Sequence, residues 1–414
     1  MPFKLNQQQK EVIAHKEGPL LLLAGAGTGK TTTIKNKVSY LINIQKIHPE
    51  KILLLSFNES AALSMKLELG EALGDIANQI TISTFHGFAK MIVDENYIKL
   101  GYSSVPQLAD ESLCYFILRE NYNQFDSLYS IDFKRDPNQA IVHLKTFFDR
   151  LSDELILLGA LKDYRDLIIK DLDQTDDDYE LKCQLIDAIN IYQKYQNIKK
   201  KINFIDYGDI IINLWLLLNH EPSILEKLQS KYQYILVDEF QDNNYALNMI
   251  LNLIGLPDHN VIVVGDPKQC IYSFRGANYF NIEQFIEYYH QNINFESLVL
   301  SQNYRSTQSI LNFANHLMIE DDNLTDVPLF SEKKSKFIPL LAINESSGKI
   351  AQIKFIIKEI KLLLDKGVEP NQIAILCRLN SHCQYVNEVL IKNHLYSNYV
   401  SGSFFSQRII KDFL

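Results

Sequence analysis

Ala24-Gly25-Ala26-Gly27-Thr28-Gly29-Lys30-Thr31 is the stretch that decides the fold of this 414-residue chain. It follows an apolar run at residues 19–23 and precedes a helical pattern, which is the context of a phosphate-binding loop. Glycines let backbone N–H groups converge on phosphate oxygens, and the start of a helix adds partial positive charge. Lys30 can then reach the β- and γ-phosphates, and the Thr31 hydroxyl can bind Mg²⁺. A plain glycine-rich turn leaves the Lys-Thr pair unexplained, so the stretch predicts a nucleotide site.

A second candidate site lies in Val237-Asp238-Glu239-Phe240-Gln241-Asp242, at the end of the apolar run at 234–237. Asp238 can hold Mg²⁺ through water, and Glu239 can orient and deprotonate an attacking water, because phosphoryl transfer depends mainly on positioning and charge neutralisation. Two acids at a strand end can also form an ordinary turn. Their pairing with the phosphate-binding loop favours catalysis.

The apolar pattern along the chain predicts an α/β fold. Short runs at residues 19–23, 52–56, 79–84, 234–238 and 261–265 are typical of buried parallel strands, and helical patterns such as 61–73 lie between them. Residues 101–200 differ, because 141–148 and 179–195 have helical spacing and few strand-like runs occur. A third section begins at 278, with candidate strands at 297–300 and 373–377 and a helix at 349–364.

Composition sets limits on partners and compartment. The chain has 46% hydrophobic and 22% charged residues, which is a globular balance. Its net charge of −9 counts mildly against nucleic acid, although 22 Tyr and 22 Phe offer rings for base stacking. Five scattered cysteines without metal-ligand spacing indicate free thiols in a reducing compartment. The polar start and short apolar runs favour a cytoplasmic protein without a membrane partner.

The ordered motifs resemble those of UvrD/Rep/PcrA-type superfamily 1 DNA helicases. Five segments carry the resemblance besides the two sites above: Leu5-Asn6-Gln7-Gln8-Gln9, Leu55-Ser56-Phe57-Asn58-Glu59-Ser60-Ala61-Ala62, Thr81-Ile82-Ser83-Thr84-Phe85-His86-Gly87-Phe88, Gly265-Asp266-Pro267-Lys268-Gln269-Cys270-Ile271-Tyr272-Ser273-Phe274-Arg275-Gly276-Ala277 and Gln302-Asn303-Tyr304-Arg305-Ser306-Thr307. The resemblance implies a RecA-like P-loop NTPase that uses ATP and Mg²⁺ to move 3′ to 5′ along single-stranded DNA and to unwind duplex with a 3′ tail.

The resemblance also implies a role for each motif residue. The expected ATP-binding residues are Gln9, Ala24, Gly25, Ala26, Gly27, Thr28, Gly29, Lys30, Thr31, Thr32 and Tyr304. The expected catalytic residues are Lys30, Asp238, Glu239, Gln269 as γ-phosphate sensor and Arg305 as arginine finger, with Thr31 and Asp238 holding the metal. The expected DNA-binding residues are Phe57, Thr84, Phe85, His86, Tyr272, Phe274 and Arg275. Isolated aromatics of this kind are core residues more often than DNA contacts.

The family pattern further divides the chain. It implies a first RecA-like domain at 1–100 and 201–277, a helical insertion at 101–200 and a partial second RecA-like domain at 278–414. The family pattern continues beyond Leu414, so we expect a downstream segment or protein partner to supply the rest. Thr32, Ser60 and Leu247 depart from residues common in the family, which puts single nucleotide and DNA contacts in doubt.

Three functions remain open from the sequence. The first is an ATP-dependent DNA helicase or translocase, and the second is a single-stranded-DNA-dependent ATPase or ATP-sensing subunit without independent helicase activity. The third is a non-catalytic DNA-binding remnant, against which the intact Lys30, Asp238, Glu239 and Arg305 argue. The pathway, whether repair, replication restart, recombination or defence, is not encoded in these motifs, although DNA repair is typical of the family.

Overall fold

The computed structural model describes residues 5–125, 136–256, 260–273, 276–277, 280–318, 328–333 and 348–399. The chain divides into two compact units, Met1–Phe337 and Ile338–Leu414. Among the described helices, none is both long and apolar enough to cross a lipid bilayer.

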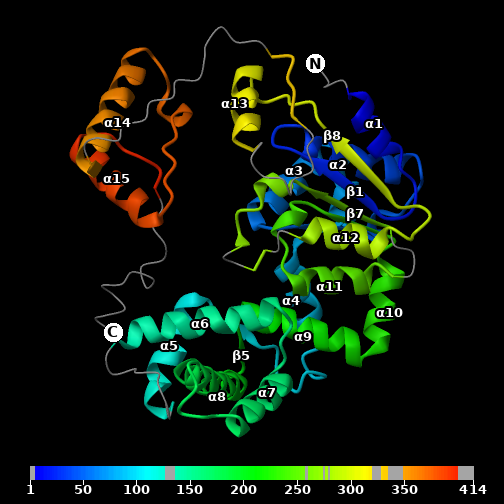
Figure 1. The fold of residues 1–414 in the computed structure, drawn as a ribbon. Helices are drawn as coiled ribbons and strands as arrows, with labels where there is room; N and C mark the ends of the chain where they lie inside the picture. Colours follow the sequence, from blue (N-terminus) through cyan, green and yellow to red (C-terminus); the bar gives the residue numbers. More distant parts are fainter. Residues whose placement is uncertain are drawn as a thin grey trace. The chain divides into compact units, whose positions relative to one another are not determined.

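The first unit is built on a sheet in which every neighbouring pair of strands is parallel (Figure 1). The strand order in the described chain is β3-β2-β6-β7-β1-β8. The strands are β1 (Leu20–Ala24), β2 (Ile52–Ser56), β3 (Thr81–Thr84), β6 (Tyr234–Val237), β7 (Val261–Gly265) and β8 (Glu296–Leu300). The prediction of an α/β fold with a parallel sheet is therefore confirmed.

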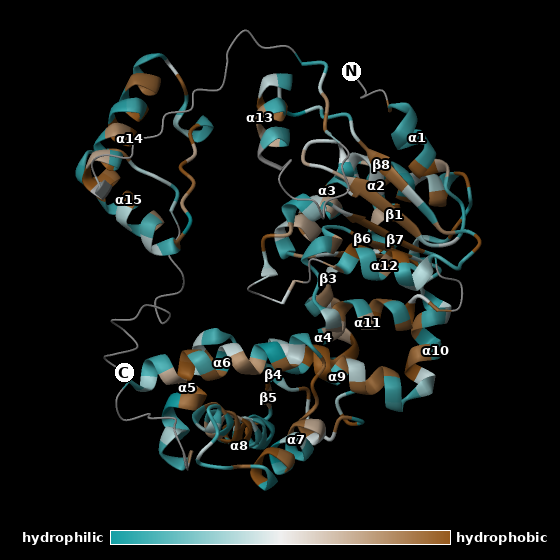
Figure 2. Ribbon diagram, viewed as in Figure 1, coloured by the Kyte–Doolittle hydropathy of each residue, from teal (hydrophilic) through white to brown (hydrophobic). Residues whose placement is uncertain are grey.

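Helices cover both faces of this sheet because successive strand residues face opposite sides. Leu53 and Leu55 of β2 belong to one hydrophobic cluster, and Ile52 and Leu54 belong to the other. One face is covered by α1 (Gln7–Ala14), α2 (Lys30–Asn43) and α3 (Glu59–Leu73). The other is covered by α4 (Phe85–Glu95), α9 (Tyr207–His220), α10 (Pro222–Lys231), α11 (Tyr245–Ile254) and α12 (Asn281–Tyr289). Figure 2 shows the hydrophobic strands between these amphipathic helices.

A separate hydrophobic cluster holds together the helical segment, which we define as residues 111–201. Its helices are α5 (Glu111–Asn121), α6 (Pro137–Asp153), α7 (Leu158–Lys170) and α8 (Tyr179–Lys201). The short parallel strands β4 (Gln107–Leu108) and β5 (Phe204–Ile205) pair where the chain enters and leaves this segment.

A buried ion network lies at the end of α8. The Lys199 ammonium lies 2.7 Å from an Asp206 carboxylate oxygen and 2.5 Å from an Asp209 oxygen. The Tyr195 hydroxyl also donates to Asp206, and both aspartates accept backbone N–H groups at the start of α9. This network joins the helical segment to α9, which packs on the sheet.

Two expectations about the third section can be compared with the described residues. The strand predicted at 297–300 is β8, and it pairs with β1 in the first sheet instead of opening a second domain at 278. The apolar pattern predicts a strand but does not specify its partner. Residues 373–377 belong to no strand among the described residues, and Leu376 is 94% exposed.

The remaining elements are helical. In the first unit, α13 (Gln308–Met318) follows β8. The second unit contains α14 (Gly348–Asp365), the short helix η7 (Pro370–Gln372) and α15 (Asn380–Lys392). A second RecA-like domain therefore stays a prediction.

Candidate nucleotide-binding site

The phosphate-binding loop joins β1 to α2 through glycines in left-handed backbone. Gly27 has φ +75° and Gly29 has φ +87°, conformations that favour glycine. A Cβ at Gly27 would also lie 2.7 Å from Asn303 Nδ2 and from Arg305 Cβ. Thr28 is fully buried, and its hydroxyl donates to the Gly25 carbonyl at 2.8 Å. The loop therefore brings backbone, rather than side chains, to the place where phosphates would lie.

The two predicted catalytic motifs meet at an ion pair. Lys30 Nζ lies 2.7 Å from Glu239 Oε2, and the Lys30 side chain is only 11% exposed. Glu239 follows β6 and has a left-handed backbone, with φ +53°. Burial, and then the adjacent Glu239 charge, raises the pKa of Asp238 to about 6. The structure thus brings Lys30, Asp238 and Glu239 together at the carboxyl ends of β1 and β6, two parallel strands that flank β7, and ligands of such sheets bind at this edge.

Gln241 links this pair to the predicted γ-phosphate sensor, and the sequence analysis did not single it out. Its Nε2 donates to Glu239 Oε2 at 2.8 Å, and its Oε1 accepts from the Asp266 N–H at 3.0 Å. Asp266 in turn accepts from Gln269 Nε2 at 2.6 Å. The sequence signal that could have found Gln241 was its position two residues after Glu239.

Gln9 of α1 also lies against the phosphate-binding loop. Its Nε2 donates to the Thr28 carbonyl at 3.3 Å, while its Oε1 accepts from the Asn6 N–H at 3.1 Å. A Cβ at Gly29 would lie 2.8 Å from Gln9 Nε2. The buried amide therefore caps α1 and contacts the loop at once.

The segment after β8 also reaches the loop. Tyr304 N donates to the Gly27 carbonyl at 2.8 Å, and Asn303 Nδ2 donates to the Ala26 carbonyl at 2.5 Å. The Asn303 Oδ1 accepts from the Arg305 N–H at 2.9 Å, which fixes the backbone beside the predicted arginine finger. Asn303 was missed by the sequence analysis. Because β8 pairs in parallel with β1, the segment that follows β8 lies beside the loop that follows β1.

Comparison with known proteins identifies the family. Residues 5–290 match the UvrD/REP helicase N-terminal domain. The chain belongs to the UvrD/REP helicase family. Residues 298–414 match the UvrD-like helicase C-terminal domain, so the resemblance seen in the sequence is confirmed over both parts.

Curated relatives of this helicase family align with nearly the whole chain. An ATP-dependent DNA helicase PcrA of Bacillus subtilis is 31% identical over 417 residues, which cover 99% of this chain and 52% of the relative. The PcrA of Staphylococcus epidermidis is 29% identical over 420 residues, covering 99% and 53%. The chain therefore spans about half the length of the curated relatives it matches.

The Mg²⁺ used by such helicases can be tested against the residues present. Thr31 stands in the first turn of α2, and Asp238 directly follows β6. Oxygen donors of this kind suit Mg²⁺. Asp238 is buried next to Glu239, and burial first and the Glu239 charge second raise its pKa, so a divalent cation would favour its charged form. The residues therefore fit the metal.

The residues predicted to contact DNA fall into four groups, of which Phe85 and His86 form the last. Phe57 and Tyr272 stack with their ring centroids 5.1 Å apart, which brings two predicted motifs together. Thr84 caps α4 by accepting from the Gly87 N–H at 3.0 Å, so its hydroxyl is already committed. Phe274 and Arg275 lie outside the described residues.

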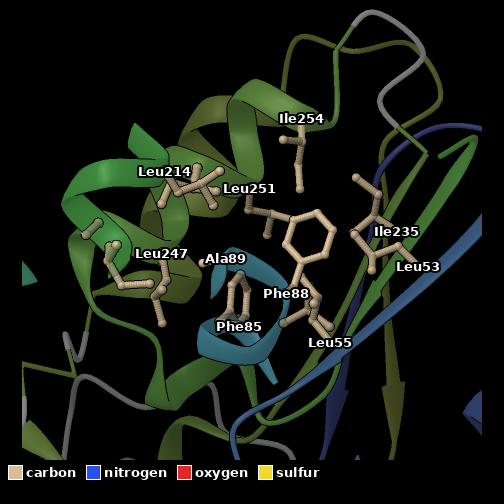
Figure 3. Packing of buried hydrophobic residues seen from close by; sticks show 14 of the residues in the cluster. Leu53, Leu55, Phe85, Phe88, Ala89, Leu214, Ile235, Leu247, Leu251 and Ile254 are labelled. Atoms are coloured by element: carbon tan, nitrogen blue, oxygen red, sulfur yellow. The ribbon is translucent and has the colours of Figure 1, made fainter. Parts of the chain in front are cut away.

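Phe85 and His86 depart from the prediction. Phe85 is buried in the cluster beside the sheet, between the labelled residues of Figure 3, so its ring is covered by the core and not available to a base. His86 meets Tyr207 edge-on at 5.7 Å, and burial lowers the pKa of its imidazole to about 4. A neutral imidazole provides no cation for phosphate.

Proposed function

We propose that this chain binds and hydrolyses ATP as the motor of an ATP-dependent DNA helicase or translocase that moves along single-stranded DNA. The Lys30–Glu239 ion pair at the phosphate-binding loop carries this proposal, with Asp238 beside it. The relatives named ATP-dependent DNA helicase PcrA support the same activity.

The site residues divide the chemistry between them. An ATP phosphate would take Lys30 from Glu239, because a phosphate carries more negative charge than one carboxylate. Glu239, released from Lys30, would then orient and deprotonate water. The hydrogen bond from Gln241 would keep its carboxylate in place. Gln269 and Arg305 would sense and neutralise the γ-phosphate.

Thr31 and Asp238 would hold Mg²⁺, which when bound neutralises phosphate charge. Gln9 would read the adenine edge, because an amide offers a donor and an acceptor. Tyr304 would stack on the adenine, because the hydrogen bond from its N–H to the Gly27 carbonyl places it beside the phosphate-binding loop.

The DNA strand would be held mainly by stacking, which suits a chain with a formal charge of −9. Phe57 and Tyr272 form the candidate platform. We propose 3′ to 5′ movement by likeness to the family. The second candidate is a DNA-dependent ATPase without independent unwinding.

Steady-state ATP hydrolysis with and without oligo(dT) tests the proposal. We expect Mg²⁺-dependent hydrolysis that rises with oligo(dT) and disappears in Glu239→Gln. Hydrolysis that ignores both DNA and this substitution would refute it. Strand displacement on duplexes with 3′ or 5′ tails then separates the candidates: unwinding only with the 3′ tail supports the helicase, and DNA-stimulated hydrolysis without displacement supports the ATPase.

A further inference from the structure

The last turn of α6 has one face toward the core of the helical segment and another toward the ATPase motifs. Phe148 and Leu151 of this helix are buried in the cluster of the helical segment. Arg150 and Asp153 point instead toward the turn formed by residues 266–273 and 276–277, which we call the sensor turn because it carries Gln269. Nothing in the proposed ATP chemistry uses these two residues.

Both side chains hydrogen-bond to the motifs. Arg150 Nη2 donates to the Ser273 carbonyl at 2.7 Å. Asp153 Oδ1 accepts from Asn244 Nδ2 at 2.6 Å, and Asn244 caps α11 through the Leu247 N–H at 3.0 Å. One turn of α6 therefore contacts the sensor turn and the segment that follows Glu239.

Gly276 shows how closely the turn fits between them. Its backbone is left-handed, with φ +85°. A Cβ there would lie 2.5 Å from Asp153 Oδ2 and 3.0 Å from Arg150 Nη1. The Gly276 N–H donates to the same Ser273 carbonyl that Arg150 bonds. The positive φ favours glycine at this position, and a Cβ would require both side chains to move.

Short contacts continue from this turn to the ATP site. Cys270 Sγ lies 3.4 Å from the Gln241 carbonyl, and Gln241 bonds Glu239. Ser273 is three residues further along the same turn. A displacement of α6 would therefore move Ser273, which lies on the same turn as Gln269, the predicted γ-phosphate sensor.

The end of α6 packs closely on α9 at one point. Gly208 of α9 lies so close to Ser152 that a Cβ would overlap the Ser152 hydroxyl. Beside Arg150 and Asp153, however, lies a cavity of about 360 Å³ whose wall includes His86, Lys145 and Tyr207. Polar contacts next to open space can rearrange without repacking a core.

We propose that Arg150 and Asp153 are positioning residues that clamp the sensor turn to the helical segment, so that the nucleotide state at Gln269 and the position of α6 are coupled. The coupling rests on the proposed function. The clamp itself rests only on the contacts above.

Cys270 reports on the clamp without any ligand. We expect Arg150→Gln to raise the rate of Cys270 alkylation by iodoacetamide, followed by peptide mass spectrometry, roughly threefold to tenfold. Arg150→Lys, which keeps a cationic donor, should restore most of the protection. Arg165→Gln is the matched control, since Arg165 bonds Asp166 and Asn190 within the helical segment. Unchanged alkylation of Cys270 in Arg150→Gln overturns the clamp, whereas acceleration of Cys183 as well would indicate general loosening and also count against it.

The second measurement tests the coupling. Fluorescent oligo(dT) affinity is measured with and without a non-hydrolysable ATP analogue, in the parent and in Asp153→Ala and Arg150→Gln. We expect the analogue to change the affinity in the parent and to change it at least about threefold less in the variants. Equal changes refute the coupling. A parent that binds neither ligand refutes the proposed function but leaves the Cys270 result to decide the clamp.

Discussion

Two lysine–carboxylate pairs with the same 2.7 Å separation lie in different regions of this molecule. Lys30 bonds Glu239 at the phosphate-binding loop, and Lys199 bonds Asp206 at the end of α8. The second site is closed, because Lys199 also bonds Asp209 and its side chain is only 1% exposed. The first is open on one side, since the Glu239 side chain is 30% exposed.

The difference teaches how to separate a structural pair from a functional one. At Lys199 the carboxylates accept from the ammonium, from Tyr195 and from backbone N–H groups, so a ligand would only disrupt the network. Lys30 has one carboxylate partner that a phosphate can replace. Distance alone does not distinguish them; the remaining partners and the exposure do.

The largest effect should come from Lys199→Met. Removing the cation leaves buried carboxylates uncompensated, so we expect the free energy of unfolding to fall by about 3–5 kcal/mol. Urea denaturation measures it. Lys99→Met, which removes an exposed pair with Glu221, should cost less than about 1 kcal/mol. Equal losses in the two variants would contradict a structural role for the network.

The same variant should change the response to acid. Burial alone would raise the pKa of Asp206, but the charges of Lys199 and Lys145 and the hydrogen bonds from Lys199 and the Asp209 N–H together outweigh it and hold the pKa well below its usual range. The stabilisation from Asp206 is therefore present above about pH 4 and is lost as the pH falls through the folded-state pKa. Burial and the Asp206 charge raise the pKa of Asp209, so Asp206 carries this acid-sensitive part. The stability gap between parent and Lys199→Met should narrow between pH 7 and pH 3; a constant gap would argue against charge pairing.

At the open site, Glu239→Gln should affect turnover rather than folding. The amide keeps the shape but cannot accept the proton of water, so we expect hydrolysis to fall about a hundredfold or more while nucleotide affinity is retained. Stopped-assay turnover and calorimetric binding on the same preparation measure the two. Glu226→Gln on α10 is the surface control. Loss of affinity together with turnover would assign Glu239 to binding instead.

Lys30→Met should have the opposite profile to Lys199→Met. We expect nucleotide affinity to drop roughly tenfold to a hundredfold, the loss of a charged hydrogen-bond donor. The melting temperature without nucleotide should change little, because Glu239 can turn to water. A variant that melts well below the parent would place Lys30 in the structural class.

Gln9→Ala should give the smallest effect. Its amide is already committed to Asn6 and Thr28, so adenine would exchange hydrogen bonds rather than add them. We expect the preference for ATP over GTP to weaken by roughly 1 kcal/mol, with phosphate affinity less affected. Competition binding of the two nucleotides measures the ratio, and an unchanged ratio would exclude an adenine-reading role.

Much of the sheet could be predicted because buried parallel strands are short apolar runs bounded by turns. The runs at 52–56 and 261–265 coincide with β2 and β7. The sheet to which β8 belongs could not be predicted, since periodicity carries no information on strand partners. Residues 373–377 show the same limit, because this apolar run pairs with no other strand among the described residues.

The site was predictable where chemistry requires a residue type. Lys30 and Glu239 were found this way, and their meeting at 2.7 Å agrees with the pairing of the two motifs. Gln241 and Asn303 were missed because amide contacts depend on tertiary neighbours. Phe85 was assigned to DNA wrongly, although Phe85, Phe88, Ala89 and Ile92 have the i, i+3, i+4, i+7 spacing of a core face.

The left-handed backbone of Glu239 sets a limit on improving this protein. A non-glycine residue at φ +53° costs roughly 1–2 kcal/mol, yet this residue must carry the carboxylate. Selection for thermal tolerance alone would favour glycine or asparagine at this position and would thereby remove the proposed catalytic carboxylate. Stability and the proposed activity therefore conflict at a single backbone angle. A screen for thermostable variants that does not also measure hydrolysis would select inactive chains.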